Sequence, residues 1–234
     1  MPSLTKSLMT TLAQQKLQSF PTRPTGAFLT ECNNYISGVC DAIVFAHNLW
    51  RTQAYFSLVK INGAIATGGK LNGPSLESMI TMQAPRVGLK NLAGKYSASI
   101  AKGIAGVWTD FQGGCRVGGV PWYPSFQAFP GPVAPHTPNV PTPMLTCAPN
   151  VSILSTGSLK ARMVAAHGGP GPLTGELFES IAAGFSQAAT IWLSSQQVVG
   201  VIGWGPVPAF QPPQSPVGMV VNGDIVAAPP HLGT

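Results

Sequence analysis

The sequence predicts a mainly α-helical protein with short β-hairpins and long Pro/Gly-rich extended arms, an irregular α+β fold with an internal duplication. Apolar residues recur at helical spacing in several long segments, Asn62-Gly63 separates two strand-like runs, and residues 120–150 contain nine prolines. We expect N-terminal helices with a hairpin in residues 1–92, a helix with its arm in residues 93–150, and a second such unit in residues 151–234.

Two helices are predicted before the hairpin, a short amphipathic one in residues 3–19 and a longer one in residues 27–50. Their apolar positions recur at helical spacing: Leu4, Leu8 and Leu12 in the first, and Phe28, Tyr35, Val39 and Phe45 in the second. Pro21 ends the first helix because proline lacks the N–H group that a helix needs. Residues with high strand propensity then flank Asn62-Gly63, which favours a hairpin turn, and a short helix begins after Pro74.

Three further helices are predicted in the rest of the chain. A long helix in residues 91–111 is expected to end at Gly113-Gly114 with a left-handed cap, because glycine adopts that conformation without strain. Ser158 and Thr174 are expected to cap the next two helices through their hydroxyl groups. Gly168 follows the first of these two helices and predicts its end.

Two stretches of the sequence share one layout. Trp108 precedes Phe126 by 18 residues, Trp192 precedes Phe210 by 18 residues, and "PSFQAFPGPVA" aligns with "PAFQPPQSPVG" without a gap. Upstream, "SIAKG" matches "SIAAG". We interpret each stretch as one unit of a duplication: a helix that ends in Trp, a Gly-containing strand or turn, and a Pro-rich arm. Trp50 ends a third, more distant helix of the same kind. The alternative to a duplication with two arms is an irregular Pro-rich loop that covers the core.

Charged residues are scarce and unevenly distributed. They make up 9% of the chain, against roughly 25% in ordinary soluble domains. All 13 basic residues lie at or before Arg162, whereas Glu176, Glu179 and Asp224 are the charged residues that follow it. The low charge favours a surface that neighbouring subunits cover. The uneven distribution predicts that the C-terminal region packs against basic segments of its own chain or of neighbouring chains.

The sequence shows no arrangement of residues that identifies a reaction. The glycine-rich "GAIATGGKL" does not fit a phosphate-binding loop, because Leu71 follows the lysine where Ser or Thr would bind Mg²⁺. Cys32 and Cys40 lie about 12 Å apart along the predicted helix, too far to bind one metal ion together with His47. We therefore expect no enzyme activity, cofactor or metal, and we expect reduced cysteines and no membrane span.

Aromatic residues in the arms and in the helices before them are the candidate interaction residues. The arms are too rich in proline to pair as sheets, so we expect other chains, or helices distant in sequence, to bury them. The predicted anchors are Trp108, Trp122, Tyr123, Phe126, Phe129, Trp192, Trp204 and Phe210. A basic region is a second candidate surface, for a phosphate backbone or for acidic groups: Lys60, Lys70, Arg86, Lys90, Lys95 and Lys102.

The arms "VPWYPSFQAFPGPVAP" and "GPVPAFQPP", together with the charge-poor, Gly/Pro/Ala-rich composition, resemble virion structural proteins of tailed bacteriophages and related contractile particles. This resemblance covers residues 95–234. It implies a non-enzymatic structural subunit of a tail, baseplate or neck, located in the virion, assembled in the host cytoplasm, and bound to copies of itself and to other structural subunits. The alternative is a capsid-associated or a basic, cytoplasmic nucleic-acid-associated protein.

Overall fold

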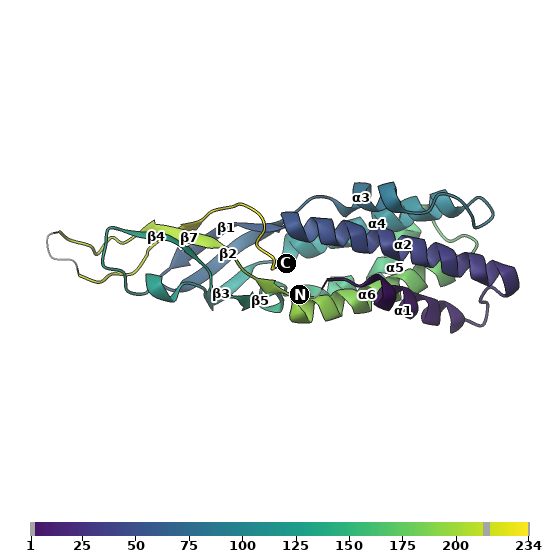
Figure 1. The fold of residues 1–234 in the computed structure, drawn as a ribbon, viewed down its shortest axis with the longest axis horizontal. Coiled ribbons are helices and arrows are strands. Elements are labelled where there is room, and N and C mark those ends of the chain that lie inside the picture. The colour runs from purple at the N-terminus through teal and green to yellow at the C-terminus, as the bar shows by residue number, and fades with distance from the viewer. Residues whose placement is uncertain (1–2, 213–215, 234) are drawn as a thin grey trace.

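The chain forms an elongated α+β molecule whose helices gather at one end and whose strands taper to a tip at the other (Figure 1). A computed structural model describes residues 3–212 and 216–233, so residues 213–215 of the second predicted arm lie outside the described residues. Within the described ranges there are six α-helices: α1 Lys6–Gln18, α2 Gly26–Gln53, α3 Leu76–Gln83, α4 Ala93–Gly114, α5 Thr156–His167 and α6 Thr174–Ser195.

The bundle alternates long and short helices. The long helices α2, α4 and α6 run side by side and end facing the strands, as Figure 1 shows. Helix α1 packs between α6 and α2, α3 packs between α2 and α4, and α5 packs between α4 and α6. A short helix, a long helix and a strand therefore follow one another three times along the chain.

Glycines allow two of the short helices to approach the long ones closely. A Cβ atom on Gly103 of α4 would lie 2.8 Å from the Cα atom of Met163 in α5. A Cβ atom on Gly184 of α6 would lie 2.6 Å from the carbonyl oxygen of Met9 in α1. Both distances are shorter than side chains tolerate. The matched pentapeptides "SIAKG" and "SIAAG" thus end in glycines with the same packing role.

The strands form small antiparallel sheets. One has the order β1-β2-β3, the next has the order β4-β7-β8, and β5 pairs with β6. A bridge between Ile61 and Gly223 connects the first two sheets. The strand bounds are β1 Tyr55–Asn62, β2 Ile65–Asn72, β3 Val117–Pro121, β4 Val133–Pro138, β5 Thr142–Pro143, β6 Gln197–Val198, β7 Ile202–Pro206 and β8 Asp224–Ile225. Single 3₁₀ turns lie at Pro124–Phe126, Met144–Cys147 and Val151–Leu154.

The prediction that the proline-rich segments cannot pair as sheets is wrong. Strand β4 of the first segment (residues 120–149) and β8 of the second (residues 206–230) both pair with β7, and a bridge joins Phe129 of the first segment to Gly218 of the second. Prolines fit here because β4 is an edge strand, where a missing N–H group removes no hydrogen bond from the sheet. The register also shifts between Ala134 and Thr137, around Pro135. The two segments therefore support each other.

The predicted helices and hairpin are confirmed, with corrections to their faces. The buried face of α1 consists of Met9, Ala13 and Leu17, one position after the predicted leucines Leu8 and Leu12, which are half-buried. Phe45 of α2 is 44% exposed and does not belong to the core. The hairpin loop lies at Gly63-Ala64, one residue later than predicted, because Asn62 still pairs with Ile65.

Three predicted caps are wrong, whereas the predicted helix end before Gly168 is confirmed, and Gly168 itself is a left-handed cap. Helix α4 ends at an extended Cys115, and Gly114 is needed for space instead, since a Cβ atom there would lie 2.0 Å from the amide nitrogen of Asn150. Two helices begin differently from the prediction: Ser155, not Ser158, caps α5, and the Thr174 hydroxyl bonds to the backbone of Gly171. Among the described residues, no helix combines the length and apolar character needed to cross a bilayer.

Candidate interaction surface

Most of the predicted anchors are buried within their own chain. Five of them are at most 1% exposed: Trp108, Trp122, Tyr123, Phe126 and Trp192. Phe129 and Phe210 are partly buried against the same core, whereas Trp204 is 39% exposed. Strand residues distant in sequence, not the expected helices, contact the aromatic residues of the first arm: Phe56 of β1 meets Trp122, and Gly203 of β7 lies against Tyr123. Trp204 is the most exposed of the predicted anchors.

The three long helices bring their tryptophans together where the bundle meets the strands. The ring centroids of Trp50, Trp108 and Trp192 lie 4.9–6.1 Å apart. His47 of α2 contacts all three rings, at 5.6, 5.1 and 4.5 Å respectively. The recurrent Trp near each helix end was the sequence signal for this aromatic junction. The central position of His47 has no signal of its own in the sequence.

His47 is a buried neutral base. Neither of its ring nitrogens has a hydrogen-bond partner among the described residues, and burial lowers the pKa of its imidazole to about 3. Within the described part of the chain, the buried indole N–H of Trp108 has no partner either. The described ring contacts of His47 are with three indoles, so the junction has the composition of a packing centre.

The cysteines are buried thiols. Cys32, Cys40, Cys115 and Cys147 are all free, and burial raises the pKa of Cys40 and Cys115 to about 12. A thiol with so high a pKa carries almost no thiolate at neutral pH, and thiolate is the form that attacks substrates and binds metals. Within the described part of the chain, no group of three potential metal ligands is found.

The predicted basic residues are distributed over both ends of the molecule. Lys60 and Lys70 lie on β1 and β2, and the other four lie on or between helices of the bundle: Arg86, Lys90, Lys95 and Lys102. The Lys60 amine pairs with Asp224 at 2.5 Å, and the Lys90 amine lies 4.9 Å from the centre of the Phe28 ring. This distribution does not concentrate the positive charge on one end.

The predicted pairing of C-terminal acids with earlier basic segments is confirmed within the chain. Glu179 forms ion pairs with Lys16 at 2.8 Å and with Lys160 at 2.7 Å, and hydrogen bonds from these two amines lower the pKa of its carboxyl group. Asp224 pairs with Lys60 in the same way. These contacts fasten α1 and α5 to α6, and β8 to β1.

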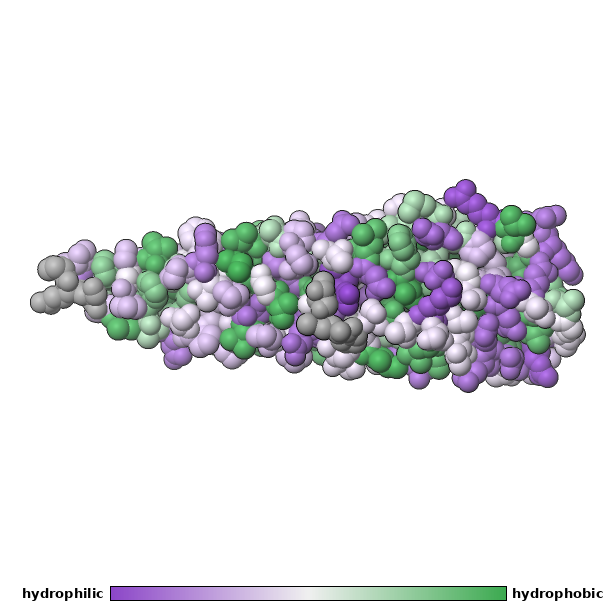
Figure 2. Space-filling model, in the orientation of Figure 1, coloured by the Kyte–Doolittle hydropathy of each residue, from purple (hydrophilic) through white to green (hydrophobic). Residues whose placement is uncertain are grey.

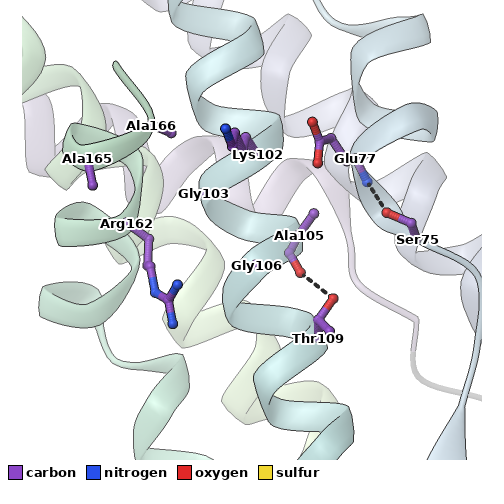
Figure 3. A pocket seen from close by; sticks show the side chains of 10 residues that line it. All are labelled: Ser75, Glu77, Lys102, Gly103, Ala105, Gly106, Thr109, Arg162, Ala165 and Ala166. Atoms are coloured by element: carbon purple, nitrogen blue, oxygen red, sulfur yellow. Dashed lines mark hydrogen bonds between the residues drawn. The ribbon is translucent and has the colours of Figure 1, made fainter. Parts of the chain in front are cut away.

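A groove of about 400 Å³ runs between α3, α4 and α5 (Figure 3). Small residues form much of its lining, including Gly103, Gly106 and Ala165, and the charged side chains around it are Lys102, Glu77 and Arg162. Several polar groups already have partners. The Arg162 guanidinium pairs with Asp110 at 2.5 Å, and the Ser75 hydroxyl accepts a hydrogen bond from the Glu77 N–H. The described lining includes no nucleophile with an adjacent base, so it shows no catalytic arrangement.

The strand end carries a different hollow, of about 550 Å³, lined by Val133, Ala134, Pro135, His136 and Trp204. Period-two alternation in β7 explains why Trp204 points outward. Gly203 and Gly205 face inward, where a Cβ atom would lie 2.6 Å from the Tyr123 ring and from the Gly223 Cα atom, respectively. The His136 ring meets the indole of Trp204 edge-on, with centroids 5.9 Å apart. Two aromatic side chains on paired strands thus border one apolar hollow.

We define the β end as residues 54–72, 115–155, 196–212 and 216–233. Its charged residues are Lys60, Lys70, Arg116 and Asp224. Figure 2 shows apolar patches over this tapered half, on the face in view. The exposed large apolar side chains of the β end are Leu58, Ile65, Val133, Val140, Leu145, Trp204, Val217, Met219, Val221 and Val226. Those described on the bundle are Phe45, Leu49, Met82, Val87 and Ile191. The β end therefore combines low charge with high apolar exposure, and we name this set its apolar surface.

Comparisons with protein-family models, with curated proteins and with solved structures find no match to this chain. The geometry of the chain itself is therefore the basis for a function.

Proposed function

We propose that this protein is a non-enzymatic structural subunit of a large protein assembly, and that the assembly is a phage virion or related contractile particle. The single observation that carries the proposal is the apolar surface of the β end. Ten large apolar side chains are exposed there among four charged residues. Apolar patches such as those that Figure 2 shows over this end mark an interaction surface in soluble proteins, because their contact with water is unfavourable in a free monomer.

The shape of the molecule supports the same proposal. The apolar surface lies on the β end, which tapers away from the helical bundle (Figure 1). The aromatic junction lies where the long helices meet this end. An elongated subunit with an apolar surface at one end suits a tail, baseplate or neck, where subunits bridge between layers. We place the protein in the virion, assembled in the host cytoplasm, in agreement with the resemblance of its Pro-rich segments to virion proteins.

An internal duplication is the finer part of the proposal about the fold. The threefold recurrence of short helix, long helix and strand supports it, as do the three tryptophans of the junction. The pentapeptide glycines Gly103 and Gly184 support it further, since each faces a methionine of the adjacent short helix. We propose three divergent units, beginning with α1, α3 and α5, instead of the two that the sequence comparison aligned.

Particle incorporation tests the proposed function. Particles sedimented from the culture that produces this protein, after nuclease treatment, should contain it in a fixed ratio to the other structural proteins. Immunogold labelling should place it at the tail, baseplate or neck. If the protein remains in the unsedimented fraction, the structural proposal fails. If nuclease releases it from the sediment, the nucleic-acid-associated alternative replaces the proposal.

A further inference from the structure

The strongest candidate for a specific contact within the apolar surface is the hollow between Trp204 and His136. The Trp204 ring projects from β7, and Val133 beside it on β4 is 51% exposed. Asp224 pairs with Trp204 across β7 and β8, but its carboxylate already binds Lys60. An apolar centre with a neutralised polar rim is the usual layout of a protein interface.

Aromatic side chains around a shallow apolar hollow favour proline as the bound residue. A segment that its own chain already holds in one conformation loses little conformational entropy on binding, and proline rings pack flat against indole faces. The hollow carries no charged side chain among its described lining residues. A charged peptide would therefore lose hydration there without gaining an ion pair, whereas an uncharged proline-rich segment has no charge to desolvate.

The chain itself supplies such a segment. Residues 206–212, "PVPAFQP", are uncharged, and Pro206, Pro208 and Pro212 are exposed. The Phe210 N–H donates to the carbonyl of buried Val207 at 3.1 Å, and this bond closes a turn that presents Pro208 to solvent. Pro206 is the last residue of β7, so the segment and the hollow lie on the same end of the molecule (Figure 1).

The distribution of charge favours a second copy as the source of the segment. Contact between two β ends would bury few charges, because each β end has four charged residues. Two of these, Lys60 and Asp224, neutralise each other in an ion pair. The helical bundles hold ten basic and six acidic residues, and they would remain at opposite ends of the pair. Net repulsion between two positively charged copies is therefore smallest when they meet through their β ends.

We propose that the hollow lined by Val133, His136 and Trp204 binds the proline-rich segment 206–212 of a second copy of this chain. This inference deepens the proposed function and rests on it, because it names one partner of the apolar surface. Each copy carries both a hollow and a segment, so reciprocal exchange gives a closed dimer.

Sedimentation and tryptophan fluorescence test the contact on the full chain. We expect the wild-type protein to form dimers as its concentration rises to about 200 µM, a range that detects weak association. Acrylamide quenching follows the site directly, because Trp204 is the exposed tryptophan among the five, and quenching should fall as dimers form. Trp204→Ser and Pro208→Ser should each weaken dimerisation at least about tenfold. Ile191→Ser, on the exposed bundle, is the matched control and should dimerise like the wild type.

Mixing the variants adds a sharper readout. A mixture of Trp204→Ser with Pro208→Ser should form heterodimers more tightly than either variant dimerises alone, because one intact hollow then meets one intact segment. Circular dichroism should show the same helix content in all three variants, and Val133→Ser gives a second variant of the hollow. Dimers that both hollow variants leave unchanged would overturn the contact.

Two other outcomes would also overturn it. One is a monomer at every concentration with constant quenching. The other is a monomer that binds neutral phosphatidylcholine vesicles with a blue shift of the Trp204 emission, which would make the apolar surface a lipid-binding one. Incorporation into particles separates this failure from failure of the proposed function. If Trp204→Ser enters particles at the wild-type ratio while no dimer forms, the structural role stands and the self-contact does not.

Discussion

His47 shows how one buried side chain makes the stability of this fold depend on pH. Burial lowers the pKa of His47 to about 3 and that of His231 to about 4, against 6.5 for an ordinary imidazole. The unfolded chain therefore binds protons between pH 6.5 and these lower values, whereas the folded chain does not. By linkage, the free energy of unfolding has its full value, as far as these two histidines determine it, above pH 6.5. It decreases as the pH falls below 6.5.

We predict that His47→Leu makes the stability of the protein less sensitive to acid. Leucine fills a similar volume and leaves no ring nitrogen without a hydrogen bond, so stability at pH 7 should stay equal or increase. Between pH 6.5 and 4 the variant should lose roughly 3 kcal/mol less than the wild type. Urea unfolding at several pH values measures this, with the exposed His136→Leu as control. An unchanged acid dependence in the His47 variant would show that another group controls it.

Phe126 and Trp204 should respond in opposite ways to removal of the ring. The sequence pattern treats both as anchors for a partner, but Phe126 is fully buried and stacks on Tyr123 with centroids 5.0 Å apart. We expect Phe126→Ala to lower the free energy of unfolding by about 3–5 kcal/mol, as a cavity in a core does. Trp204→Ala should change it by less than about 1 kcal/mol. Chemical denaturation of both variants decides this, and equal losses would contradict the assigned burial.

At the scale of elements, the glycines of the matched pentapeptides make a testable pair. We predict that Gly103→Ala and Gly184→Ala each destabilise the protein by about 1–3 kcal/mol, because the added methyl group would overlap the backbone of α5 or α1. Gly106→Ala in the same helix α4 is the control. It has open space at its Cβ position and should stabilise the protein by up to about 1 kcal/mol. Thermal unfolding of the three variants tests this, and a loss at only one of the first two would argue against equivalent units.

The sequence predicts the helices better than their assembly, for a physical reason. Helix formation depends on local spacing and on breakers such as Pro21, so the positions of α1, α2 and α4 follow from the sequence. Pairing of β4 with β7 joins segments more than sixty residues apart, and nothing local specifies it. Caps are difficult as well, because neighbouring serines such as Ser155 and Ser158 compete for one role.

The sequence identified Trp204 as a candidate interaction residue but did not separate it from aromatic residues that are buried. Aromatic residues in a proline-rich segment show no regular alternation, so the sequence did not separate buried Trp122 from exposed Trp204. The alternation Gly203-Trp204-Gly205 was the available signal, since two glycines on one face of a strand leave the tryptophan on the other.

At the scale of the whole molecule, the two ends share one core. The buried apolar residues form one packed cluster, which includes Leu4 in the N-terminal segment and Leu232 near the C-terminus. The C-terminal segment returns to the junction between the bundle and the strands, where the Phe56 N–H donates to His231 Nδ1 at 2.8 Å. The His231 N–H donates to the Ala54 carbonyl, and the Val199 N–H donates to the His231 carbonyl. This segment thus joins the end of α2 to the strand region after α6.

We predict that the bundle and the β end unfold in one transition, and that removing the chain after Ala228 destabilises both. The truncation deletes buried Leu232 and the three hydrogen bonds of His231, so it should lower the free energy of unfolding by about 3–5 kcal/mol. Helix content followed by circular dichroism and tryptophan burial followed by fluorescence should then shift together, to the same lower urea concentration. A His231→Gln variant separates the hydrogen bonds from the packing of Leu232 and should show a smaller, equally coincident shift. If helix loss and tryptophan exposure separate into two transitions, the aromatic junction does not couple the two ends, and the tapered end would be an independently folding tip.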